Sequence, residues 1–286
     1  MGLADNPRMP SSSLQLLAIE TSTDTLSVAV GQGGALTCEH TGPGAAQASA
    51  TLLPAVQALL AQAAISLHTL DAIVFARGPG SFTGLRTACA VAQGLGYGAQ
   101  GAGRVGGVPL LPVDTLLALA ETARHRRTQA GLAVPRVIAA LLDARMDEMY
   151  LALYACEPQG LAPLPLQAPR LCAPADLGEH LRRSLPAGLS LEAGDCLLAG
   201  NVFTAYGAQF SELPGERETA LPTAAALLRL APGLLAAGGA VPAQDALPLY
   251  VRDKVAQTTA EREQLRLEHI ERLAGHTPAA PLDARA

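Results

Sequence analysis

Two clusters of polar side chains follow predicted strands and have residue types that bind ligands. The run Glu20-Thr21-Ser22-Thr23-Asp24 begins with the last residue of the apolar segment 14–20. In the second half of the chain, Asp143, Arg145 and Glu148 lie at and just after the end of the apolar segment 136–144. Because α/β proteins bind ligands at the carboxyl ends of strands, these groups predict a ligand site in a cleft between two halves of the chain. A polar hairpin turn and a loop ion pair between Asp143 and Arg145 explain the same residues, and the sequence leaves both interpretations open.

A glycine-rich stretch, RGPGSFTGLRTACAVAQGLGYG at 77–98, is the next candidate. It lacks the lysine of a phosphate-binding loop and does not match G-x-G-x-x-G or the nucleophile elbow G-x-S-x-G. Its backbone N–H groups could still contact an anion at a helix N-terminus. We favour the simpler interpretation, in which Ser81 caps the helix and the glycines supply the turn. The predicted ligand or anion contacts of both regions are Glu20, Thr21, Ser22, Gly78, Gly80, Ser81, Thr83, Gly84, Asp143 and Arg145.

Neither a metal site nor a catalytic motif is indicated. The six histidines form no H-x-x-x-H or H-E-x-x-H pattern, so we expect no metal and no catalytic residue in this chain. The five cysteines are widely spaced, odd in number and without C-x-x-C, which is typical of reduced thiols in a cytosolic protein. With no signal peptide or membrane-spanning segment apparent, we expect a cytoplasmic protein without membrane contact.

Composition limits the function classes. The 286 residues are 49% hydrophobic, which is enough for a sizeable core in one large or two small domains. A net charge of −5 and only 3% aromatic residues disfavour a protein that holds nucleic acid by itself. The arginines at 124, 126 and 127 are best interpreted as the solvated end of a helix.

Hydrophobic patterning predicts a duplicated α/β unit. In each half, a strand hairpin precedes further strands and helices. Strands are expected at 14–20, 25–30, 35–40, 71–76, 107–113, 136–144, 148–156 and 191–200, and helices at 49–64, 81–98, 115–128 and 222–237. We expect Asp114 and Thr115 to cap the helix at 115–128, and Pro54 to lie near the first turn of the helix at 49–64. The proline-rich segment 157–175 is interpreted as a connection, and 258–275 as a charged, helix-prone tail.

The helices at 49–64 and 81–98 have an unusual composition. The first has no charged residue, and the second carries only Arg86. A surface helix normally has a charged face, so we expect a partner to cover these two helices on the side away from the sheet. The predicted interface residues are Leu52, Leu53, Val56, Leu60, Leu85, Thr87, Ala90, Val91, Gly94 and Tyr97.

Several blocks together resemble the TsaB (YeaZ) family. They are LLAIETSTDTLSVAV, LLPAVQALL, DAIVFARGPGSFTGLRTACAVAQGL, IAALLDARMDEMYLALY, the Gly-Asn pair at 200–201, and PLYVRDKVA at 248–256. The resemblance implies an α/β fold of two actin-like (ASKHA, ribonuclease H-like) domains, each a mixed sheet flanked by helices. Two departures stand out: Glu20 occurs where the family usually has Asp, and Asp147 occurs where it usually has Gly.

The resemblance also implies a role. TsaB-like proteins act in biosynthesis of N6-threonylcarbamoyladenosine, next to the anticodon of certain tRNAs. They are non-catalytic subunits that bind the catalytic paralogue TsaD through two N-terminal helices, here 49–64 and 81–98. The ATPase TsaE joins the pair, and TsaC makes the threonylcarbamoyl-adenylate donor. On this basis the chain would hold no cofactor, ATP and metal would act through TsaD and TsaE, and tRNA would be contacted indirectly.

The resulting domain prediction has four parts: a disordered segment at 1–13, an N-terminal domain at 14–113, a second domain at 114–257 and a tail at 258–286. Two alternatives to the accessory-subunit hypothesis stay open. In the first alternative, the chain is an enzyme in its own right that hydrolyses ATP or peptides. In the second, it forms a homodimer through the same two helices without TsaD.

Overall fold

A computed structural model describes residues 13–44, 47–100, 106–192 and 194–252 of the chain. Those up to Val251 belong to one compact unit. Most of the predicted N-terminal segment and the whole predicted tail at 258–286 lie outside the described residues.

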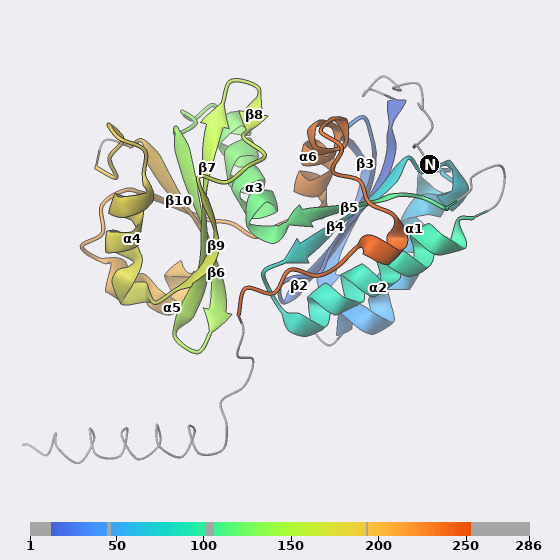
Figure 1. The fold of residues 1–286 in the computed structure, drawn as a ribbon, viewed down its shortest axis with the longest axis horizontal. Helices are drawn as coiled ribbons and strands as arrows, with labels where there is room; N and C mark the ends of the chain where they lie inside the picture. The colour runs from blue at the N-terminus through green and yellow to red at the C-terminus, as the bar shows by residue number, and fades with distance from the viewer. Residues whose placement is uncertain (1–12, 45–46, 101–105, 193, 253–286) are drawn as a thin grey trace, which may run out of the picture. The chain divides into compact units, whose positions relative to one another are not determined.

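The first sheet is mixed and has the strand order β3-β2-β1-β4-β5 (Figure 1). The hairpin strands β1, β2 and β3 are antiparallel, whereas β1, β4 and β5 run parallel. The strands are β1 (Gln15–Glu20), β2 (Thr25–Gln32), β3 (Ala35–Pro43), β4 (Ala72–Gly78) and β5 (Leu110–Asp114).

The second sheet repeats this arrangement. Its order is β11-β10-β6-β7-β8, and β9 also pairs with β7. Strands β6, β7 and β9 are antiparallel, whereas β6, β10 and β11 run parallel. In this sheet β6 therefore corresponds to β1 of the first sheet, and β9 corresponds to β3. The strands are β6 (Val137–Arg145), β7 (Glu148–Glu157), β8 (Gly160–Leu161), β9 (Gln167–Cys172), β10 (Cys196–Gly200) and β11 (Glu216–Thr219). The predicted duplication is confirmed.

Helices cover both faces of the first sheet. α1 (Ala48–Gln62) and α2 (Phe82–Gly98) pack on one face, and α6 (Ala224–Ala236) on the other (Figure 1). α3 (Thr115–Gln129) packs on β6, β7 and α6, and its first nine residues are buried. Together α3, α6 and both sheets contribute to one hydrophobic cluster. α4 (Leu177–Ser184) and α5 (Phe203–Tyr206) complete the second half.

Some local predictions are wrong in detail. The connection 157–175 contains β8 and β9, whose proline and glycine content hid them, and the strand predicted at 191–200 begins only at Cys196. Pro54 lies in the second turn of α1, because the helix begins at Ala48. Asp114 occupies the N-cap position of α3 without a capping hydrogen bond, since its Oδ1 accepts a bond from Arg77 Nε at 2.6 Å.

The predicted division at residues 113 and 114 stays a prediction. It separates the two sheets, but α6, which follows the second sheet in the chain, packs on the first. All five cysteines are free thiols.

Candidate functional site

The turn after β1 is buried although it is polar. Glu20, Thr21 and Ser22 have at most 2% of their surface exposed. Glu20 Oε1 accepts hydrogen bonds from the backbone N–H of Ser22, at 2.5 Å, and from its hydroxyl. Glu20 Oε2 has no hydrogen-bond partner among the described residues. Burial raises the pKa of Glu20 from 4.5 to about 7, against the opposing effect of the Ser22 hydrogen bonds. The carboxyl group is therefore partly protonated at neutral pH.

The glycine loop between β4 and α2 packs tightly against this turn. A Cβ atom on Gly84 would lie 1.8 Å from the carbonyl oxygen of Thr21, and one on Gly80 would lie 2.5 Å from that of Ser22. Thr21 Oγ1 donates to the Gly84 carbonyl at 2.8 Å, and the N–H of Ser81 donates to the Ser22 carbonyl at 2.7 Å. The two glycines thus permit close contact between the backbones of the loop and the turn, which the sequence analysis did not predict. The predicted cap is also present, because Ser81 Oγ accepts from the N–H of Gly84.

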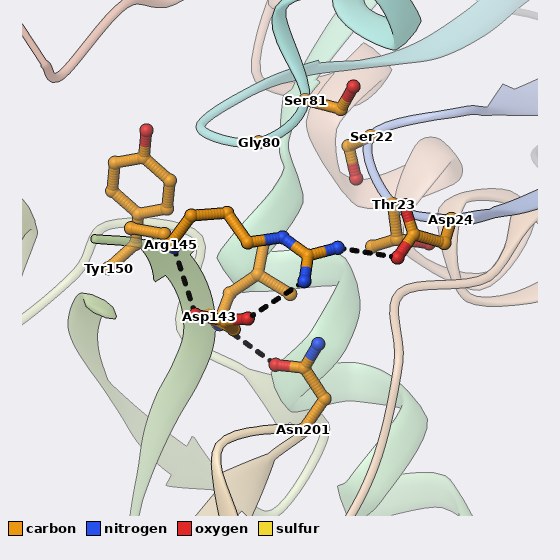
Figure 2. Close-up of a pocket in the computed structure, with 11 residues that line it drawn as sticks. Ser22, Thr23, Asp24, Gly80, Ser81, Asp143, Arg145, Tyr150 and Asn201 are labelled. Atoms are coloured by element: carbon orange, nitrogen blue, oxygen red, sulfur yellow. Dashed lines mark hydrogen bonds and ion pairs between the residues drawn. The ribbon is translucent and has the colours of Figure 1, made fainter. Parts of the chain in front are cut away.

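The corresponding turn of the second sheet brings a cation to the same place (Figure 2). The Arg145 guanidinium donates to Asp24 Oδ2 at 2.7 Å and lies 3.7 Å from Asp143 Oδ2. The N–H of Asp143 donates to Asn201 Oδ1 at 2.8 Å, which ties β6 to the residue after β10. Tyr206 donates its hydroxyl hydrogen to Asp143 Oδ1 at 3.1 Å. Arg145 therefore bridges the turns of the two sheets.

These turns enclose a small polar pocket of about 170 Å³, lined by Ser22, Thr23, Asp24, Gly80, Ser81, Leu142, Asp143, Ala144, Arg145, Tyr150 and Asn201 (Figure 2). Its size is below the roughly 300–1,000 Å³ of typical ligand pockets.

The pocket brings together only part of the predicted contact set. Ser22, Gly80, Ser81, Asp143 and Arg145 line it, and the others do not: Glu20, Thr21, Gly78, Thr83 and Gly84. Asn201 and Tyr150 were not predicted as contacts. Asn201 had a usable signal, because it directly follows a predicted strand at the same sheet edge.

The predicted partner face is split between surface and core. Leu52, Val56, Leu60 and Leu85 are buried within the chain and belong to its core. Leu53 is 43% and Tyr97 65% exposed, Ala90 and Gly94 are exposed, and Thr87 and Val91 are half-buried. A Cβ atom on Gly94 would meet no atom within 4 Å. The outer surface of α1 and α2 thus carries small, apolar and uncharged polar side chains, Gln57 and Gln62 among them, with Arg86 as its only charge.

A C-terminal segment at 246–251, which the pattern analysis did not place, crosses α2. The Ala246 carbonyl accepts from Gln93 Nε2 at 2.9 Å, and the N–H of Leu249 donates to the Arg77 carbonyl at 2.7 Å. The Tyr250 ring stacks on Phe82 with centroids 4.7 Å apart, and its hydroxyl accepts from Arg86 Nε at 3.1 Å. This segment borders the predicted partner face at the start of α2.

Comparison with known proteins places the chain. It is 30% identical over 253 residues to the tRNA threonylcarbamoyladenosine biosynthesis protein TsaB of Escherichia coli, covering 85% of this chain and 96% of that protein. The TsaB protein of Haemophilus influenzae is 31% identical, with 85% and 95% covered. The chain belongs to the TsaB family.

Structural similarity agrees with the TsaB assignment. A solved structure of YeaZ from Pseudomonas aeruginosa is 32% identical, has a TM-score of 0.67, and matches over 83% of this chain and 99% of that one. The family described as TsaD, tRNA N6-adenosine threonylcarbamoyltransferase, matches residues 43–177. The predicted α/β fold of two actin-like halves, each with a mixed sheet flanked by helices, is confirmed.

Two kinds of feature are absent from the part of this TsaB-family chain that the structure describes. Among the described residues, no group of three or more His, Cys, Asp or Glu side chains is placed to hold a metal ion. No helix in the same part of the chain has the length and hydropathy needed to cross a bilayer.

Proposed function

We propose that this chain is a non-catalytic subunit of the complex that makes N6-threonylcarbamoyladenosine in tRNA, and that it binds and stabilises TsaD and supports docking of TsaE. Its relatives are named for this biosynthesis, and residues 43–177 match the TsaD family, so the chain is related to its proposed partner. In this role it holds no cofactor itself and contacts tRNA through the complex, in the cytoplasm.

The observation that carries the proposal is the nearly uncharged outer surface of α1 and α2. Residues 48–62 contain no charge and residues 82–98 contain one, although many of their side chains face outward. Monomeric proteins rarely expose contiguous surfaces of this kind. Tyr97 and Leu53 supply large exposed apolar groups, and Ala90 and Gly94 allow close approach of a partner helix.

The geometry of the polar pocket supports a non-catalytic role. Arg145 pairs with Asp24 at 2.7 Å and with Asp143 at 3.7 Å, so both carboxylates are engaged in the ion pairs that join the two turns. The Glu20 carboxyl is closed off by burial and by Ser22. These side chains hold the two turns together instead of facing a substrate-sized cavity.

Reconstitution tests this function. TsaC, TsaD, TsaE and unmodified tRNA from the same organism are incubated with threonine, bicarbonate and ATP, with and without this chain, and modified adenosine is measured by mass spectrometry. We expect modification to require the chain. Modification at the same rate without it would refute the proposal, and ATP or peptide hydrolysis by the isolated chain would favour an independent enzyme.

The interface is tested in the same assay. Ala90→Glu places a charge on the exposed side of α2, and Ala187→Glu places the same charge on an exposed loop remote in sequence from both helices. We expect the first variant to lose stimulation and the second to retain it. Equal activity of the two variants would remove α2 from the interface.

A further inference from the structure

A second cavity, larger than the polar pocket, lies among α3, α6 and the end of β7. Its volume is about 490 Å³, within the range of small-molecule sites. It is lined by Glu121, Arg124, Glu157, Gln159, Gly160, Leu161, Pro163, Arg229, Leu230, Gly233 and Leu234. None of these residues belongs to α1, α2 or the turn after β1, so the cavity is separate from both regions described above.

One wall of this cavity carries an excess positive charge. The Glu121 side chain is 3% exposed and accepts hydrogen bonds from Arg124 Nε and Nη2, at 2.7 and 2.9 Å, and from Arg229 Nε at 2.9 Å. Two guanidinium groups thus share one carboxylate, which leaves one uncompensated positive charge. Within the described residues, neither terminal nitrogen of Arg229 has a hydrogen-bond acceptor. Arg229 therefore keeps donors for a further anion, and its guanidinium suits the planar geometry of a carboxylate.

The other walls are largely apolar. Leu161, Pro163, Leu230 and Leu234 contribute aliphatic surface. Gly233 lies inside α6, where Ala would be the better helix former, and a Cβ atom there would meet nothing within 4 Å. A glycine at this position leaves space open in the cavity.

Glu157 is the second carboxylate of the lining, and with it the two arginines and two glutamates of the cavity sum to zero charge. It is exposed and its Oε2 accepts from Gln159 Nε2 at 3.1 Å. Solvent screens an exposed carboxylate more strongly than the half-buried arginines, which are about 21% and 23% exposed. Its effect should be a moderate weakening of anion binding.

We propose that this cavity binds a small monocarboxylate with a short apolar chain, the carboxylate on Arg229 and the chain against Leu161, Leu230 and Leu234. One negative charge balances the one excess positive charge of the Arg124–Glu121–Arg229 group. The site does not depend on the partner interface or on the proposed function.

Calorimetric titration of the full-length chain with hexanoate tests the site. Hexanol serves as the uncharged probe of the same length. We expect saturable hexanoate binding and at least about tenfold weaker hexanol binding, as charge-assisted hydrogen bonds require. No saturable hexanoate binding, or equal binding of the alcohol, would overturn the proposal.

Four variants locate the binding. Arg229→Gln should weaken hexanoate binding at least about tenfold. Gly233→Leu, which adds a bulky side chain to the lining and keeps both arginines, should also weaken it. Glu157→Gln should strengthen it by a few fold, and Arg183→Gln, an exposed arginine on α4, should leave it unchanged. Circular dichroism confirms the fold of each variant. Undiminished affinity in the folded Gly233→Leu variant would place any binding elsewhere and overturn the assignment.

Discussion

Glu20 should make the stability of this protein fall as pH rises through neutrality. Its pKa is 4.5 in the unfolded reference and about 7 in the folded chain, because burial disfavours the charged carboxylate. Between these values the folded state binds a proton that the unfolded state releases, so this group's contribution to stability is complete below about pH 4.5 and is lost as pH rises through about 7. Each pH unit in that interval changes the free energy of unfolding by about 1.4 kcal/mol, which gives about 3 kcal/mol in total.

The variant Glu20→Gln isolates this effect. The amide Oε1 still accepts from the Ser22 N–H and hydroxyl, but the side chain does not ionise. Urea unfolding of both proteins at constant ionic strength should show that the variant gains about 3 kcal/mol relative to the native chain between about pH 4.5 and about pH 8.5. Glu39→Gln, an exposed change on β3, serves as the control and should give a much smaller pH dependence. If the difference between native chain and Glu20→Gln is the same at both pH values, Glu20 is ionised in the folded state and the burial argument is wrong.

Three further changes test other contacts. Gly84→Ala should lower the free energy of unfolding by about 3 kcal/mol, because its Cβ would lie 1.8 Å from the Thr21 carbonyl oxygen. The control Gly94→Ala should cause no loss, since a Cβ atom there meets no atom within 4 Å. An unfolding curve for Gly84→Ala that matches the native one would contradict this packing. Arg86→Glu reverses the only charge of the α1 and α2 helices and should weaken TsaD binding at least about tenfold in a calorimetric titration, with unchanged affinity counting against that surface. Met146→Gly should raise the free energy of unfolding by about 0.5–1 kcal/mol, because Met146 has φ 58° and is 48% exposed; a decrease would show that its side chain makes stabilising contacts.

Periodicity was sufficient for most of the fold. The apolar strands at the start of each half and the uncharged helices have strong local signals, and the repeated hairpin revealed the duplication. Strand β9 had no comparable signal, because Gln167–Cys172 alternates weakly and contains a proline. The capping hydrogen bond predicted for Asp114 on α3 is absent for another reason. The carboxylate of Asp114 is bonded to Arg77, 37 residues away, and spacing along the chain does not predict such a contact.

The candidate sites were predictable only in part. Strand-end polar residues such as Ser22 and Asp143 do meet in a pocket, as the sheet topology requires. Burial of Leu52 and Val56 could not be distinguished from exposure, because a helix without charged residues has no charged face to orient it. The segment that carries Tyr250 lacks regular structure, so only tertiary contacts such as its stacking on Phe82 fix its position.

Asp147 shows how a departure from the family pattern fits the structure. Arg145, Met146 and Asp147 all have positive φ values, of 62°, 58° and 55°, in the turn between β6 and β7. Glycine adopts this conformation most readily, and aspartate tolerates it better than most residues. The replacement of the usual glycine by Asp147 therefore preserves the turn that positions Arg145.

The central claim is direct pairing with TsaD through α2, and light-scattering mass of this chain mixed with TsaD from the same organism tests it most directly. The native chain and Ala187→Glu should each form a one-to-one complex, whereas Ala90→Glu should leave both proteins separate. A homodimer of this chain that persists in the presence of TsaD, or an Ala90→Glu variant that still elutes with TsaD as a one-to-one complex, would contradict the account.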